Sequence, residues 1–172
     1  MMTSREIVLN TLEYKKPERV ARSFGDSDFS WASCKIKTHA TDWEKINESR
    51  WERIDEWGNT WARLDPTSKG EVVKGVLENV EDINDYQFPD YSHFESYACV
   101  SECRKNYADK WLIGSMPGFA FNIARKMRKL EQYLMDLLQE REQMSLLHDR
   151  IDEMLEAMIR NYAAAGVDSI MF

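Results

Sequence analysis

The chain lacks long apolar runs and has few cysteines. Its first residues include Arg5 and Glu6, which exclude a signal peptide, and no stretch is long and apolar enough to cross a bilayer. The three cysteines, Cys34, Cys99 and Cys103, are an odd number in a chain without an export signal. The sequence therefore predicts reduced thiols, a cytoplasmic protein and no membrane contact.

Positive charge is also in short supply. The chain has 23 Lys and Arg against 30 Asp and Glu, a net charge of −7 at pH 7. Non-specific binding to nucleic acid needs a basic surface, so no nucleic-acid partner is expected. A small anion stays open as a ligand, because a few arginines are enough to hold one. With 43% hydrophobic and 31% charged residues, the 172 residues predict one folded globular domain over 1–172.

Several segments have helical patterns. Thr3 and Glu6 fit a capping box, and the helix that follows is expected to end before Pro17. A second helix is predicted to start near Thr41 or Asp42. Further helical patterns, whose apolar residues recur at helical spacing, cover 80–88, 92–108 and 119–165, the last with a break near Arg141 and a C-cap at Gly166.

Extended segments alternate with these helices. Strands are expected over 19–24, 71–78, 110–118 and 167–172. Residues 55–66, DEWGNTWARLDP, predict a hairpin with Gly58–Asn59 as a two-residue turn. The succession of strand and helix predicts an α/β fold with parallel strands. Because 167–172 is apolar throughout, it is expected inside a parallel sheet, and its position at the end of the chain suggests a longer protein.

Candidate binding residues lie at the predicted carboxyl ends of two strands and in the helix after the second, where β/α folds place their sites. Arg22 could hold a substrate carboxylate or form a surface ion pair. Met116 and Phe119 could line an apolar wall or simply pack within a loop. The full candidate set is Arg22, Ser23, Gly114, Ser115, Met116, Phe119 and Asn122.

Metal-binding patterns are weak. Cys99 and Cys103 are four residues apart on one face of a predicted helix, but two thiols are too few for a zinc site, and buried free cysteines are common. His39, His93 and His148 are scattered, and His148 is expected to be solvated. No catalytic triad can be proposed, so the catalytic residues are unknown and no metal ligand is expected within this chain.

The order of several segments resembles a known family. These segments are TSREIVLNTLEYKKPERV, DEWGNTWARLD, LENVEDINDYQFPD, GSMPGF with LEQYLMDLL, and YAAAGVDSIMF. In this order they resemble the N-terminal half of the uroporphyrinogen decarboxylase superfamily, and most of all its branch of corrinoid-linked methyltransferases. The resemblance implies an incomplete TIM-type (β/α) barrel with N-terminal helices and a β-hairpin excursion.

The resemblance implies two activities for the full-length protein. The first is methyl transfer from a corrinoid cofactor or corrinoid protein, with zinc bound by residues of the C-terminal half. The second is decarboxylation of a tetrapyrrole, which the family performs without a cofactor, using arginines after the first strand. Here only Arg22 stands in that region, and the family's tyrosine in the helix after the GSMPGF loop corresponds to Lys126 or a neighbour. This chain alone is expected to be inactive, or to act by association with itself or with a missing C-terminal half.

Overall fold

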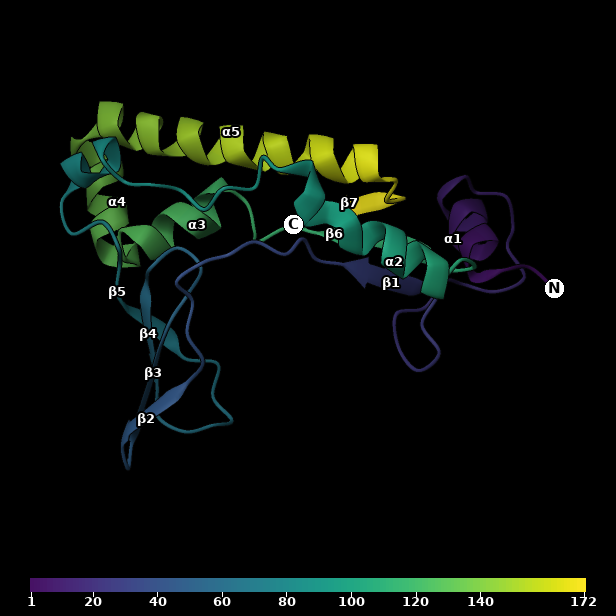
Figure 1. Cartoon of the computed structure of the whole chain (residues 1–172), viewed down its shortest axis with the longest axis horizontal. Coiled ribbons are helices and arrows are strands. Elements are labelled where there is room, and N and C mark those ends of the chain that lie inside the picture. Colours follow the sequence, from purple (N-terminus) through teal and green to yellow (C-terminus); the bar gives the residue numbers. More distant parts are fainter. The chain divides into compact units, whose positions relative to one another are not determined.

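The structure, a computed structural model, describes all 172 residues, which form two compact units (Figure 1). The first unit comprises Met1–Lys35, Tyr91–Pro117 and Leu155–Phe172. The second comprises Ile36–Asp90 and Gly118–Met154. None of the helices is both long and apolar enough to span a membrane.

The first unit contains a three-stranded parallel sheet in the order β1-β6-β7. The strands are β1 (Phe29–Ala32), β6 (Trp111–Ser115) and β7 (Ser169–Met171). The helical elements of this unit are α1 (Ser4–Leu12), the 3₁₀ turn η2 (Phe94–Tyr97), α2 (Ala98–Asn106) and the last turns of α5 (Arg141–Ala165). The coarser fold prediction, an α/β protein with parallel strands, is confirmed, although the strands do not close into a barrel.

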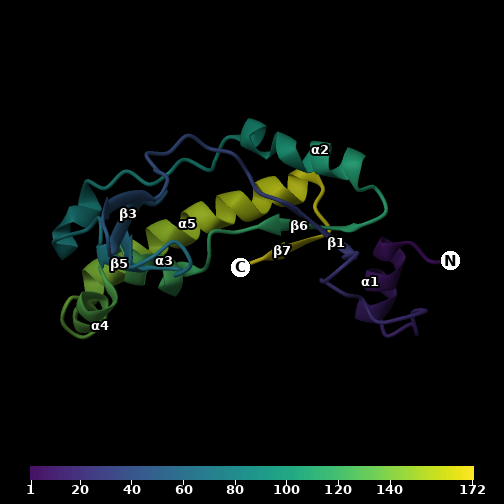
Figure 2. The same cartoon turned by 90° about the horizontal axis from the view of Figure 1, so that it is seen from below.

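The two faces of the parallel sheet differ. One face packs against helices: α2 contacts β1 and β6, and Tyr162 of α5 lies against Gly114. Side chains alternate between faces along each strand, so Trp31, Ile113 and Ser169 share the other face. In Figure 2 no helix lies in front of β1, β6 and β7. Trp31 is 45% exposed there. Helices therefore cover one face of the sheet, and on the other Trp31 is exposed although Ile113 is buried.

The second unit contains an antiparallel sheet in the order β2-β3-β4-β5. Its strands are β2 (Glu44–Asn47), β3 (Arg50–Ile54), β4 (Thr60–Arg63) and β5 (Glu71–Lys74). The helical elements are the 3₁₀ turn η1 (Val80–Asn84), α3 (Ala120–Met127), α4 (Leu130–Gln139) and the first turns of α5. The backbone of β5 and α3 is in close contact, because a Cβ atom on Gly75 would lie 2.2 Å from the carbonyl oxygen of Met127.

Several predicted elements are confirmed. The Thr3 side chain caps α1, and Glu6 completes the capping box. Strands form within 71–78, 110–118 and 167–172. Gly166 follows α5 with φ 91°, and its N–H donates to the carbonyl oxygen of Tyr162. These elements have strong local signals, namely a cap, an apolar run or a C-terminal glycine.

Two predicted elements are wrong. Residues 19–24 form no strand, because Arg19 and the Arg22 N–H both bind the buried carboxylate of Asp28 and fold this segment into a loop before β1. The helix predicted near Thr41 is instead a hairpin of β2 and β3. Its side chains alternate between the two faces of a sheet and pair across strands, which a local helical pattern does not reveal.

The turn and the long helical pattern also differ from expectation. The hairpin of β3 and β4 exists, but Ile54 pairs with Thr60 and the loop between them has five residues rather than two. The break before Arg141 is confirmed, and a second break separates α3 from α4 at Arg128 and Lys129. His148 is not solvated as predicted. It is partly buried, and its Nε2 lies 3.0 Å from the Tyr133 hydroxyl.

Candidate functional site

The carboxyl edge of the parallel sheet brings the ends of three strands together in the first unit. Cys34 follows β1, Met116 follows β6, and Phe172 follows β7. The Met116 N–H donates to the carbonyl oxygen of Met171 over 3.0 Å, which extends the pairing of β6 and β7 beyond their ends. Catalytic groups of β/α folds come from this edge. It is therefore the first candidate site.

Tyr162 of α5 fixes this edge from the helical side. Its hydroxyl oxygen accepts a hydrogen bond from the Cys34 N–H over 2.8 Å, and its O–H donates to the carbonyl oxygen of Ser115 over 3.0 Å. Its ring packs edge-on against Tyr97 with the centroids 4.8 Å apart. Burial raises the pKa of Tyr162, so the hydroxyl keeps its proton as a donor. One side chain thus ties the ends of β1 and β6 together.

The predicted residues Gly114, Ser115 and Met116 do meet at this edge. A Cβ atom on Gly114 would lie 2.9 Å from the Tyr162 ring, so this position has a packing reason to be glycine. Ser115 is partly buried, and its carbonyl oxygen is held by Tyr162. These residues can therefore present backbone and side-chain groups to a ligand from a fixed position.

Arg22 and Ser23 do not belong to this edge. They precede β1 rather than follow it, so they lie on the amino side of the sheet. The Arg22 N–H binds Asp28, and its side chain donates to the carbonyl oxygen of Asp26 over 3.1 Å. The prediction that they lie at the carboxyl end of a strand is wrong. The first strand was expected over 19–24, but it is β1 and begins after them.

Phe119 and Asn122 belong to the second unit. Phe119 precedes α3, is exposed, and stacks on Phe121 with the centroids 6.4 Å apart. The Asn122 side-chain oxygen accepts a hydrogen bond from Arg125. Both residues therefore make local contacts around α3, and the seven candidates do not gather in one unit.

The cysteines bind backbone oxygens. The thiols of Cys99 and Cys103 donate to the carbonyl oxygens of Ser33 and Trp31 over 3.2 and 3.5 Å. Burial raises the pKa values of Cys34 and Cys99, which disfavours the thiolate that binds zinc. No group of three or more His, Cys, Asp and Glu side chains is placed to hold a metal ion.

The amino edge of the same sheet contains two buried carboxylates. Asp28 pairs with Arg19 over 2.5 Å, and this guanidinium holds the pKa of Asp28 well below its usual value. Asp168 accepts hydrogen bonds from Arg5, Arg104 and the N–H of Leu112. Fixed ion pairs of this kind suit a stabilising role, since this end of a β/α sheet is usually structural.

A cation–π ladder covers one face of the antiparallel sheet. Arg63 lies over Trp43 at 4.3 Å and over Trp51 at 5.5 Å, and Arg53 lies over Trp43 at 5.2 Å and over Trp61 at 5.3 Å. The Nε atoms of both arginines are buried without a hydrogen-bond partner, and the Arg63 Nη1 donates to the carbonyl oxygen of Pro66 over 3.0 Å. The ring faces add cation–π contacts to both guanidinium groups. Two tryptophans of the hairpin therefore pack within this ladder.

Asp55 holds the hairpin loop in shape. Its buried carboxylate accepts the backbone N–H groups of Trp57 and Asn59, the Asn59 side-chain amide and the Trp61 indole N–H, the last over 2.6 Å. Trp57 itself is 2% exposed. The tryptophans of DEWGNTW are thus fixed by packing and hydrogen bonds. Trp57 lines one pocket, beside Tyr86 and Phe88, and Trp61 lines another.

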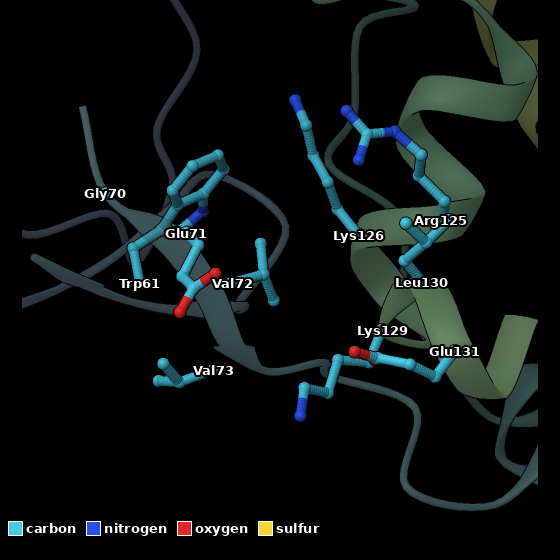
Figure 3. A pocket seen from close by; sticks show the side chains of 10 residues that line it. All are labelled: Trp61, Gly70, Glu71, Val72, Val73, Arg125, Lys126, Lys129, Leu130 and Glu131. Carbon is cyan, nitrogen blue, oxygen red and sulfur yellow. The ribbon is translucent and has the colours of Figure 1, made fainter.

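That pocket lies between β5 and the junction of α3 with α4 and has a volume of 360 Å³ (Figure 3). Figure 3 shows Arg125 and Lys126 extending the same way from α3. The pocket is lined by three cations, two carboxylates and an apolar wall, namely Arg125, Lys126, Lys129, Glu71, Glu131, Trp61, Gly70, Val72, Val73 and Leu130. Sequence reasoning missed it, although the repeated Trp-x-Arg pattern at 51–53 and 61–63 marks strands with one aromatic face.

Comparisons of the chain with models of protein families, with curated proteins and with solved structures find no match.

Proposed function

We propose that the three parallel strands are the first part of an incomplete TIM-type (β/α) barrel. The proposal is carried by the observation that helices cover one face of this sheet, while Trp31 and Met171 on the other face are 45% and 53% exposed. Parallel sheets are normally covered on both faces. In a complete barrel, this uncovered face points inward and packs against strands from the rest of the domain.

The proposed activity of the complete barrel is methyl transfer with a corrinoid cofactor or corrinoid protein. This assignment is supported by the resemblance to the uroporphyrinogen decarboxylase superfamily. Ser115 and Met116, at the carboxyl edge, contact the substrate, and Tyr162 keeps their backbone in place. The zinc that activates the thiol acceptor in the methyltransferase branch has no ligand set in this chain. In this proposal the chain alone is inactive.

Decarboxylation of a tetrapyrrole is the weaker alternative. That reaction needs arginines near the carboxyl edge of the parallel sheet to hold several carboxylates of the substrate. Here Arg19 is paired with Asp28, and Arg22 lies at the amino edge of the sheet. Association without catalysis is the other alternative, and the uncovered sheet face favours it. Self-association is then expected, and a clean monomer in sedimentation at high protein concentration would count against it.

The experiment combines the purified chain with methylcobalamin, zinc and a small thiol, and follows the corrinoid absorbance. We expect no demethylation, because the proposal places the zinc ligands outside these 172 residues. Steady turnover by the chain alone would refute the proposal that it is an inactive part of a barrel. Reading the coding region after codon 172 tests the reaction type. A His-x-Cys motif with a later cysteine supports methyl transfer, and a continued barrel without them contradicts it.

A further inference from the structure

We propose that the pocket between β5 and the α3–α4 junction binds a small organic anion, in which a carboxylate or phosphate is joined to an apolar body. The pocket lies entirely within the second unit. The proposal does not depend on the barrel or on methyl transfer.

The first support for the proposal is that the cations lining the pocket form no ion pair within the chain. Arg125, Lys126 and Lys129 all line the pocket, and none of them forms an ion pair with a carboxylate. The Arg125 Nε donates only to the Asn122 side chain, over 3.2 Å. Arg125 and Lys126 extend the same way from α3, so their like charges repel one another, and a bound anion reduces this cost (Figure 3). Guanidinium and ammonium groups are also the common partners of carboxylates and phosphates.

The apolar wall is the second support. Trp61 and Val72 line the side of the pocket toward the sheet, and Leu130 lines the side toward α4 (Figure 3). The Trp61 ring is held in place by the bond from its indole N–H to Asp55 and by Arg53 over the ring, and Lys126 lies 5.6 Å from its centroid. A fixed aromatic wall beside a cation suits a ligand with both an apolar and an anionic part. A volume of 360 Å³ lies at the small end of the range for such ligands.

The two carboxylates limit the charge of the ligand. Glu71 and Glu131 leave the lining with a net charge of +1, from three cations and two anions. In Figure 3 the Glu71 carboxylate points away from the ends of Arg125 and Lys126. Together with the net charge of −7 of the chain, this lining disfavours long polyanions such as nucleic acid. A small molecule with one anionic group fits better.

Lys129 adds a structural sign of function. It has φ 64° and ψ 138°, a backbone conformation that residues with a side chain rarely adopt, and its side chain does not cap α4. The Tyr133 N–H donates to its carbonyl oxygen over 2.9 Å, which holds Lys129 at the N-cap of α4. A lysine held in a conformation suited to glycine is consistent with a role for its charge at this place.

The test is isothermal titration of the full chain with phenyl phosphate, benzoate, inorganic phosphate and benzylamine. We expect phenyl phosphate or benzoate to bind saturably, one molecule per chain, and benzylamine not to bind. Arg125→Gln and Lys126→Gln should each weaken binding by about tenfold or more, as expected for the loss of a charged hydrogen bond. The matched control is Lys105→Gln, because Lys105 is exposed on α2 in the other unit.

Lys129→Gly separates binding from folding. It removes the third cation and relaxes the backbone, so binding should weaken while the folded state is kept, as circular dichroism can show. Absence of saturable binding, or equal weakening by Lys105→Gln, would overturn the proposal. Inorganic phosphate binding as tightly as phenyl phosphate would overturn the part that requires an apolar body.

Discussion

The hydroxyl of Tyr162 donates a hydrogen bond to the carbonyl oxygen of Ser115 and accepts one from the N–H of Cys34. Tyr162→Phe removes both bonds and leaves a backbone donor without its partner. We expect the free energy of unfolding to fall by about 1 to 3 kcal/mol, measured by urea denaturation. The control is Tyr107→Phe, because Tyr107 is 47% exposed. If both variants are as stable as the natural chain, Tyr162 does not tie β1 to β6.

The buried carboxylate of Asp55 is expected to be required as an acceptor. In Asp55→Asn an NH₂ group replaces one oxygen and faces the N–H groups of Trp61 or Asn59, so two donors meet without an acceptor. We expect a loss of about 3 kcal/mol in stability, measured by urea denaturation with tryptophan fluorescence. Asp42→Asn, at an exposed residue, should have almost no effect. An equal loss in both variants would contradict this role.

The ion pair of Arg128 and Asp136 is buried on both sides, with the Arg128 Nε 2.6 Å from the Asp136 Oδ2. Arg128→Met leaves the carboxylate buried and unpaired, with a bond only from Gln132, so we expect a cost of about 3 to 5 kcal/mol. Arg128→Met with Asp136→Leu should cost less than the sum of the two single changes. A double-mutant cycle of urea midpoints measures the difference, and strict additivity would show that the pair is not coupled.

Asp168 should make the stability of the chain depend on pH. Burial alone would raise the pKa of Asp168, but hydrogen bonds from Leu112, Arg104 and Arg5 lower it below the usual value. A lowered pKa in the folded state means that the unfolded chain binds the proton more tightly. The stabilisation is therefore complete above the unfolded pKa of about 3.9 and is lost as the pH falls through the folded pKa.

The measurement for Asp168 is a set of urea midpoints between about pH 7 and pH 3. Asp168→Asn should be less stable than the natural chain at the upper end, and the gap should shrink as the pH falls. Asp149→Asn, at an exposed residue of α5, is the control. A gap that stays constant over this range would rule out the proton linkage.

Lys129→Gly is expected to stabilise the fold. Glycine adopts positive φ without a steric cost, so relief of strain at φ 64° should raise the free energy of unfolding by about 1 kcal/mol after the entropy of glycine is counted. Lys126→Gly, inside α3, should instead lower it by about 1 kcal/mol. Thermal unfolding compares the two. A loss of stability in both variants would show that Lys129 is not strained.

The elements that the sequence predicted well have signals within a few residues. The cap at Thr3, the apolar run of β6 and the glycine after α5 each specify a boundary locally. The fold class followed from the alternation of these elements. The segment after Thr41 was predicted wrongly because the contacts that make it a hairpin come from another strand.

The candidate site residues were likewise predicted correctly only where local signals specified their strand. Gly114 and Ser115 were placed correctly because β6 was predicted correctly. Arg22 was misplaced because Asp28, six residues away, draws the segment into a loop. The basic pocket could not be predicted, since its residues come from 61–73 and 125–131 and meet only when β5 packs beside α3. Local patterns do not contain this information.

The cation–π ladder has a consequence for how the hairpin finds its alignment. Trp51 stands opposite Arg63, and Arg53 stands opposite Trp61. A shift of the strands by two residues would set Arg53 against Arg63 or Trp51 against Trp61, so that cation would meet cation or each ring would lose its cation. A shift by one residue would move these side chains to opposite faces. The alternation of ring and charge thus disfavours both kinds of shift and favours the register in which each arginine lies against a tryptophan.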